Sequence, residues 1–215
     1  MCTLFCNGTL AFPLMLGSLT PLITESYTFC NYQKEGDIIQ AAVSFSPQLV
    51  FHNTRQEVLT FPEMFARILN FIKEDPRSAY RIAIGTDSQV RSKTSFVTGI
   101  LVHRVGKGAL GFLREVVVPR NIKSLREKIS LETAFTQEIA YMFTPGHIDM
   151  ILDVITANGY QDIHLDLEIH LDIGPHGPTK ELIKEMVNRV TGLGFDVKIK
   201  PYATAATSLA NRYTK

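Results

Sequence analysis

Three strand-like segments joined by short links lie in the middle of the chain and constrain its fold most strongly. Residues 80–86, 95–105 and 109–118 are rich in β-branched and other apolar residues. The last two are separated only by Gly106, Lys107 and Gly108. Links this short allow neighbouring strands to pair only in opposite directions. We therefore predict an antiparallel meander of three strands.

Helical and strand-like patterns alternate on either side of this meander. The predicted elements are a helix from 60 to 75, a helix at 124–143, a helix at 147–158, a strand at 163–173, a helix at 178–193, a strand at 195–199 and a helix at 205–213. Capping-box pairs begin two of the helices, Thr60 with Glu63 and Ser124 with Glu127. The fold class is therefore α/β, a mixed sheet of three antiparallel strands and two crossover-linked strands with helices on its faces.

The first fifty residues differ from the rest of the chain. Residues 1–24 carry no charge, and Pro13 and Pro21 interrupt an apolar stretch that is shorter than the ~20 residues of a spanning helix. A positively charged segment typical of secretion signals is missing as well. We interpret 1–50 as an irregular, poorly ordered extension with a short strand at 41–45, and 51–215 as the folded domain. A membrane anchor, a signal, or upstream sequence read through from a misassigned start are the alternatives.

Charge is unevenly distributed along the folded part. Residues 77–128 hold eleven basic and three acidic residues, whereas residues 129–185 hold ten acidic and two basic ones. A basic surface beside a carboxylate cluster suits a polyanion held near a cation, although the two halves can also neutralise each other in the fold. Only three cysteines are present, an odd number without a CxxC pair, which favours a reducing cytoplasm.

Three carboxylates stand where apolar surroundings are expected. Asp87 follows the apolar positions Ile82 and Ile84, and Asp172 ends the alternating segment 163–173. Glu132 falls on the apolar stripe of the helix at 124–143, where glutamate is rare without a partner. The alternatives are that Asp87 forms a turn and that Glu132 makes a buried ion pair with a lysine or arginine.

These carboxylates predict a metal site. If the first and fourth strands are neighbours, Asp87 and Asp172 end side by side, and the helix carrying Glu132 packs across the sheet. Such groups repel one another unless a divalent cation lies among them, and oxygen ligands favour Mg²⁺ or Mn²⁺. Two such ions can drive phosphodiester hydrolysis. His170 is a candidate proton shuttle, or it orients Asp172.

Several ordered motifs resemble the YkuK family of ribonuclease H-like proteins. They are GTDSQV at 85–90, VVVPR at 116–120, EKISLET at 127–133, HLDIG at 170–174, KIKP at 198–201 and NRYTK at 211–215. The resemblance covers about 51–215. It implies a ribonuclease H-like fold, in which an acid on the first strand, a glutamate on the first crossover helix and an acid ending the fourth strand correspond to Asp87, Glu132 and Asp172. In place of the last acid of that pattern, this chain has Asn211, an amide that can ligate a cation without adding charge.

Six basic side chains are the predicted contacts to nucleic-acid phosphates, either RNA or DNA: Arg91, Lys93, Lys107, Arg120, Lys123 and Lys180. Lys180 belongs to the GPHGPTK segment that opens the helix at 178–193. Two functions follow. One is a cytoplasmic Mg²⁺- or Mn²⁺-dependent nuclease. The other, favoured by Asn211, is a catalytically inert module that binds nucleic acid or a protein partner. We expect neither function to involve a membrane.

Overall fold

The chain divides into two compact units, Met1–Leu49 and Val50–Lys215. The computed structural model describes residues 49–157, 159, 164–174, 180–203 and 205–213, together with the backbone of 26–34 and 37–45. In the first unit, β1 (Ser26–Lys34) pairs antiparallel with β2 (Asp37–Phe45). The predicted short strand at 41–45 is therefore part of a longer pair. The sequence did not predict the full pair, because residues 26–45 show no clear period of two. The predicted irregularity of 1–25 lies outside the described residues.

The second unit is built on a seven-stranded mixed sheet with the order β4-β3-β7-β6-β5-β8-β9. Its strands are β3 (Val50–Asn53), β4 (Val58–Thr60), β5 (Tyr80–Val90), β6 (Thr94–Arg104), β7 (Gly108–Val118), β8 (Leu165–Leu171) and β9 (Asp196–Ile199). The predicted antiparallel meander is β5-β6-β7, and β8 and β9 join it in parallel. The sequence did not predict β3 and β4, because strands of four and three residues are too short to show a period.

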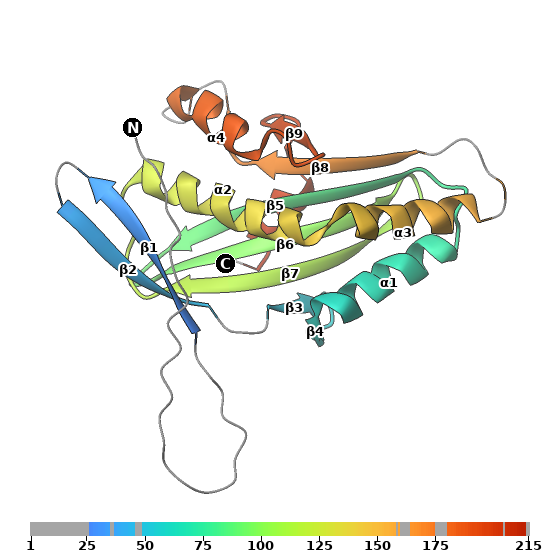
Figure 1. Cartoon of the computed structure of the whole chain (residues 1–215), viewed down its shortest axis with the longest axis horizontal. Coiled ribbons are helices and arrows are strands. Elements are labelled where there is room, and N and C mark those ends of the chain that lie inside the picture. The colour runs from blue at the N-terminus through green and yellow to red at the C-terminus, as the bar shows by residue number, and fades with distance from the viewer. Residues whose placement is uncertain are drawn as a thin grey trace, which may run out of the picture. The chain divides into compact units, whose positions relative to one another are not determined.

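Helices cover both faces of this sheet. They are α1 (Phe61–Lys73), α2 (Leu125–Met142), α3 (Pro145–Thr156), the 3₁₀ turn η1 (Lys180–Leu182), α4 (Ile183–Val190) and α5 (Ala205–Asn211). The helices α1, α2 and α3 lie over one face (Figure 1), and α5 packs against the other at Gly99 of β6. No helix among the described residues has the length and apolar character needed to cross a bilayer.

The helix boundaries follow local capping chemistry. At the start of α1, the Glu63 carboxylate accepts hydrogen bonds from the backbone N–H and the hydroxyl of Thr60, both 2.8 Å long, as predicted. Only half of the second predicted capping box forms. The Ser124 hydroxyl accepts the Glu127 N–H, but the Glu127 carboxylate pairs with Arg120 instead of returning to Ser124. The helix predicted at 147–158 begins two residues earlier, because Pro145 suits a first helical position.

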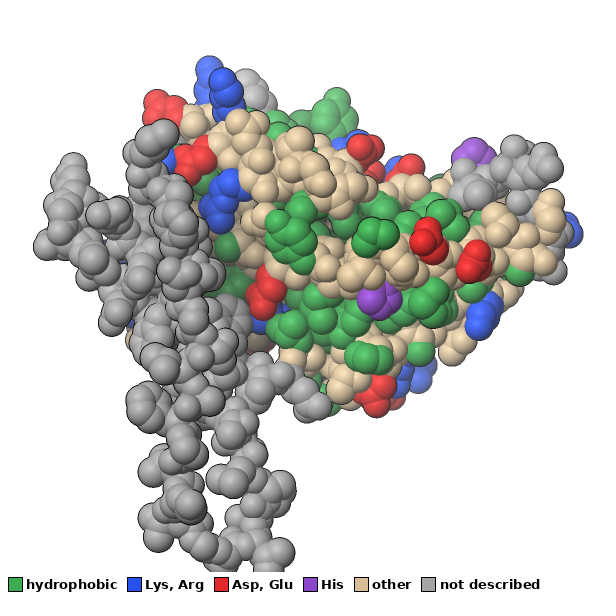
Figure 2. Space-filling model, in the orientation of Figure 1, with side chains coloured by type: hydrophobic (Ala, Val, Ile, Leu, Met, Phe, Trp, Pro, Cys, Tyr) green, Lys and Arg blue, Asp and Glu red, His purple; other side chains and the backbone are tan. Residues whose placement is uncertain are grey.

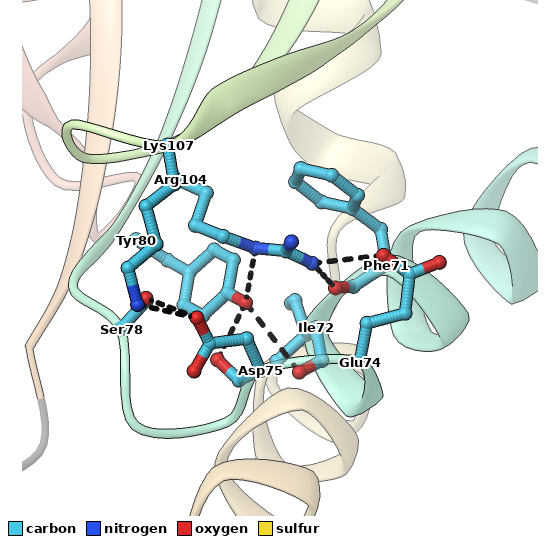
Figure 3. A network of polar contacts seen from close by, with 8 residues as sticks. All are labelled: Phe71, Ile72, Glu74, Asp75, Ser78, Tyr80, Arg104 and Lys107. Atoms are coloured by element: carbon cyan, nitrogen blue, oxygen red, sulfur yellow. Dashed lines mark hydrogen bonds and ion pairs between the residues drawn. The ribbon is translucent and has the colours of Figure 1, made fainter.

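Arg104 of β6 ties the end of α1 to the sheet (Figure 3). Its guanidinium donates to the Phe71 carbonyl, lies 3.1 Å from the Glu74 carboxylate and sits 4.1 Å from the centre of the Phe71 ring. Its Nε also donates to the hydroxyl of Tyr80, which donates onward to the Asp75 carbonyl over 2.8 Å. Carbonyls at the end of a helix have no partner within it, so these donors satisfy groups that packing would otherwise leave unpaired.

Two glycines let α5 approach the sheet closely. A Cβ on Gly99 would lie 2.7 Å from the Ala206 carbonyl oxygen, and one on Gly85 would lie 2.9 Å from the His170 carbonyl oxygen and 3.1 Å from the Thr207 side chain. Gly85 is therefore required by neighbouring protein atoms. The packing brings α5 within reach of the ends of β5 and β8.

Replacing Gly99 with alanine tests this packing. Because the new Cβ would meet backbone atoms of α5, we expect Gly99→Ala to lower the free energy of unfolding by about 1–3 kcal/mol. Thermal denaturation followed by circular dichroism would show this as a Tm lower by several degrees. Gly146→Ala is the control, because a Cβ there has only the Thr144 hydroxyl oxygen near it, at 3.9 Å. Equal losses in both variants would contradict the role of Gly99.

Candidate functional site

The parallel pairing of β5 with β8 brings two of the three predicted acids to one end of the sheet. Gly85 pairs with His170, and Asp87 and Asp172 each lie two residues beyond that pair. This confirms that the first and fourth strands of the predicted sheet are neighbours. Both acids border a surface cavity of about 160 Å³, together with Lys200, Ala203, Thr207, Ser208 and Asn211. Asn211 reaches the cavity because α5 packs so closely on the sheet.

Glu132 lies on the α2 face of the same region. It is only 7% exposed, which confirms that it points inward. The Ser88 hydroxyl donates to Oε1 of Glu132 over 2.6 Å, and the Lys128 ammonium lies 3.6 Å from the same oxygen. The alternative of a basic partner for Glu132 is thus partly confirmed. That partner is Lys128, which lies one turn earlier on α2.

A second, much smaller cavity connects Glu132 with Asp172. Its volume is about 10 Å³, the space of a single water molecule, and Thr86, Thr133 and Thr136 contribute to its lining. The hydroxyls of Thr86 and Thr136 are 2.8 Å apart, so this part of the core is polar. Asp172 therefore borders both cavities, with Asp87 and Asn211 around the larger one and Glu132 on the smaller one.

Electrostatics link the three acids. The pKa of Glu132 is raised from 4.5 to about 7, first by burial and also by the charges of Asp87 and Asp172, while Lys128 and the Ser88 hydroxyl oppose the shift. Within the described part of the chain, no group of three or more His, Cys, Asp or Glu residues lies close enough to enclose a metal ion. The three acids thus surround two adjoining cavities instead of forming one compact cluster.

The larger cavity fits a single hard cation in its chemistry. Asp87 and Asp172 supply carboxylate oxygens and Asn211 supplies an amide oxygen, the donors that Mg²⁺ and Mn²⁺ prefer. A volume of about 160 Å³ leaves room for the waters that Mg²⁺ retains. One charge is already neutralised, because the Lys200 ammonium lies 2.7 Å from Oδ1 of Asp172. Sequence reasoning did not single out Lys200, although it belongs to the KIKP motif.

His170 is buried, and protein partners occupy both of its ring nitrogens. Its Nε2 lies 2.8 Å from the Glu168 carboxylate, and its Nδ1 is 3.4 Å from the Ala206 N–H. These partners assign the proton to Nε2, so that Nδ1 accepts the amide hydrogen of α5. Burial lowers the pKa of His170, although Glu168 opposes this shift. The imidazole thus connects β8 to α5, an arrangement that suits positioning.

The buried end of β8 contains a glutamate that the sequence did not distinguish. Glu168 is only 6% exposed, and its other oxygen lies 3.2 Å from Nε of Arg81. Strict alternation would place Glu168 on the same face as His164 and Asp166, both of which are exposed. The difference arises because α5 covers only the far end of β8, which pattern alone does not reveal.

Most of the predicted phosphate contacts gather at the end of the sheet where Asp87 lies. Arg91 and Lys93 form the turn between β5 and β6, and Arg120 and Lys123 follow β7. The Asn121 side chain ties these segments together by donating to the Arg91 carbonyl over 2.7 Å. All four basic residues are exposed, as is Lys180 at the start of η1.

The structure separates Lys107 from this group. Lys107 lies in the turn between β6 and β7, at the opposite end of the strands, and its ammonium is 2.6 Å from the Asp75 carboxylate. Among the described residues that Figure 2 shows on the helix face, no single charge forms a large patch. Hydrophobic side chains follow the line where α1 meets α3, and acidic and basic ones are mixed around it (Figure 2). The strand ends near Asp87 are therefore the better candidate for holding a polyanion.

The raised pKa of Glu132 makes stability depend on pH. Between pH 4.5 and about 7 the folded state binds more protons than the unfolded state, so the free energy of unfolding falls as pH rises. We expect Glu132→Gln to remove this loss. Measured by urea denaturation with chelator present, its stability relative to wild type should rise by about 3 kcal/mol between pH 5 and pH 8.

Asp149→Asn serves as the control, because it removes an exposed carboxylate from α3. Its stability relative to wild type should stay constant over the same pH range. If the stability of Glu132→Gln relative to wild type also stays constant with pH, the raised pKa of Glu132 is contradicted.

Comparisons with known proteins agree with this architecture. A family model described as ribonuclease H-like matches residues 63–215. A Bacillus subtilis (strain 168) protein with the name "Uncharacterized protein YkuK" is 47% identical over 167 residues, which cover 77% of this chain and 97% of that protein. No solved structure shows a significant match. The family model and this relative each extend over most of the chain, so it belongs to the YkuK family of ribonuclease H-like proteins.

Proposed function

We propose that this protein is a nuclease that hydrolyses phosphodiester bonds of nucleic acid with Mg²⁺ or Mn²⁺. The observation that carries the proposal is the cavity bordered by Asp87 and Asp172 at the end of the parallel β5–β8 pair, inside a ribonuclease H-like fold. In this proposal both carboxylates and the Asn211 amide hold the cation. We place the activity in the cytoplasm, on the grounds of an odd number of cysteines without a CxxC pair.

The chain's own residues would divide the remaining work. When bound, the cation would supply Lewis-acid stabilisation of the charge that develops on the phosphodiester. Glu132, with a pKa near neutrality, can hold or accept a proton at the smaller cavity. Lys200 adds a positive charge beside Asp172. Asn211 replaces the last acid of the ribonuclease H pattern and so brings no negative charge to the cavity. His170 positions α5, and with it Asn211, through the Ala206 amide.

The exposed basic residues at the same end of the sheet support nucleic acid as the substrate. Arg91, Lys93 and Lys123 would contact phosphates, with Arg120 available when it leaves Glu127. Contacts of this kind set affinity and position, not sequence choice. Each phosphate that they neutralise releases counterions, so binding should weaken steeply as salt rises.

One observation favours a second function, a module that binds nucleic acid or a protein partner without catalysis. The Lys200 ammonium already neutralises Asp172, and Asn211 brings no charge of its own. A cavity with these groups attracts a dication less strongly than four carboxylates would. The following experiments separate the two functions.

The first experiment compares cleavage by the full chain and by Asp87→Asn. Labelled RNA/DNA hybrid, single strands and branched DNA are incubated with Mn²⁺, with Mg²⁺ or with chelator. We expect metal-dependent cleavage by wild type and a loss of about 100-fold or more in Asp87→Asn, because a misplaced cation forfeits several kcal/mol of transition-state stabilisation. Asp149→Asn should cleave like wild type.

Undiminished cleavage by Asp87→Asn would contradict the assigned site. Cleavage in the presence of chelator would contradict a role for the cation. Salt-sensitive binding of nucleic acid without any cleavage would favour the inert module.

The second experiment tests how Lys200 affects the cation. Lys200→Met removes an ammonium 2.7 Å from Asp172, so we expect Mn²⁺ to bind severalfold to about tenfold more tightly while cleavage falls. The Mn²⁺ affinity follows from the rise of Tm with Mn²⁺ concentration, because a ligand of the native state must stabilise it.

Lys198→Met is the matched control. It removes the same charge two residues earlier in the chain, on β9, but Lys198 pairs with Asp196 and does not line the cavity. An equal change of Mn²⁺ affinity in both variants would indicate a general charge effect and would contradict a direct role for Lys200.

A further inference from the structure

Tyr202 is an exposed aromatic side chain that lies, in the chain, next to residues that line the larger cavity. At 77%, it has the highest exposure of the large hydrophobic side chains in the described part of the chain. It lies between Lys200 and Ala203 in the sequence, and both of these residues line the cavity with Asp87 and Asp172. A ring this exposed adds little to the core, and its faces are accessible to a ligand.

The backbone holds Tyr202 in a fixed place. The Lys200 N–H donates to the Ile173 carbonyl over 2.9 Å, which ties this segment to the end of β8. The N–H groups of Tyr202 and Ala203 both donate to the Ile199 carbonyl, over 2.9 and 3.1 Å. The ring therefore projects from a hydrogen-bonded turn between β9 and α5, and little backbone entropy is left to lose when a ligand packs on it.

We propose that Tyr202 is a stacking platform for an unpaired base of single-stranded nucleic acid. Lys200, two residues earlier and 53% exposed, would contact the phosphate attached to that base. Stacking on an aromatic ring requires a base whose face is free, which single strands offer and the interior of a duplex does not. The inference rests on the proposed function and deepens it, because it names single strands as the substrate class.

The basic surroundings favour nucleic acid over a protein partner at this ring. Lys198 lies on β9 and Lys200 lies in the turn that follows it and leads to Tyr202. Arg91 and Lys93 are exposed at the same end of the sheet. An aromatic platform combined with positive charge is typical of proteins that bind single strands with little sequence preference.

The test measures binding by fluorescence anisotropy in chelator, so that cleavage plays no part. The probes are a fluorescein-labelled oligothymidylate, an oligouridylate, an abasic backbone of the same length and a duplex closed at both ends by linkers without bases. We expect Tyr202→Ala in the full chain to weaken binding of the single strands about tenfold, within the range of about 5–150-fold measured for base–aromatic stacking. The abasic backbone and the closed duplex should bind Tyr202→Ala and wild type equally.

Two further variants control the result. Tyr202→Phe keeps the ring and should bind like wild type. Tyr141→Ala removes another tyrosine, 62% exposed on α2 and outside the lining of the cavity, and should also bind like wild type. Weaker binding of either oligomer by Tyr202→Ala supports the proposal. The oligomer whose affinity falls more identifies DNA or RNA as the preferred strand.

Unchanged affinity of Tyr202→Ala for single strands would overturn the proposal, as would an equal loss on the abasic backbone. Either result would leave the Tyr202 surface to a protein partner. The cleavage assay reports separately on the proposed function. If the protein cleaves nucleic acid and neither binding nor cleavage depends on Tyr202, only the stacking proposal is refuted. If binding depends on Tyr202 but no cleavage occurs, only the nuclease proposal is refuted.

Discussion

The candidate site depends above all on the parallel pairing of β5 with β8. In this register Gly85 lies opposite His170, and the two following acids, Asp87 and Asp172, reach the same end of the sheet from positions 85 residues apart in the chain. The pairing is possible at this depth because Gly85 has no side chain, since a Cβ would collide with the His170 carbonyl and with Thr207. The same absence lets α5 lie on the sheet and carry Asn211 to the cavity.

The acids reach this region from opposite faces of the sheet, and their surroundings differ accordingly. Asp87 and Asp172 border a surface cavity and meet Lys200 there, whereas Glu132 is buried under α2 and has a pKa near 7. Burial of an unpaired carboxylate is unfavourable, and here one hydroxyl and one lysine offset only part of the penalty. Such a residue is destabilising to the fold at neutral pH. Perturbed acids beside a cavity are typical of functional sites.

Sequence reasoning performed well where periodicity is long and poorly where it is short. The meander and the helix carrying Glu132 followed from apolar patterns with clear turn or capping signals. The strands β3 and β4 were missed because they are short and their apolar residues do not alternate with polar ones. The pair β1–β2 was predicted only in part, because its sequence shows no clear period. The resemblance to the YkuK family indicated the same three acids that the patterns had singled out.

The sequence by itself determined the class of fold and the inward direction of Glu132, because hydrophobic periodicity specifies which face of an element is buried. Only the tertiary structure decided which distant groups meet. The positions of Lys200 beside Asp172, of His170 beneath α5 and of Lys107 at the far end of the sheet all depend on strand order and on close helix packing. Those are properties of the assembled sheet, and no local pattern encodes them, since each contact joins segments that have no common period.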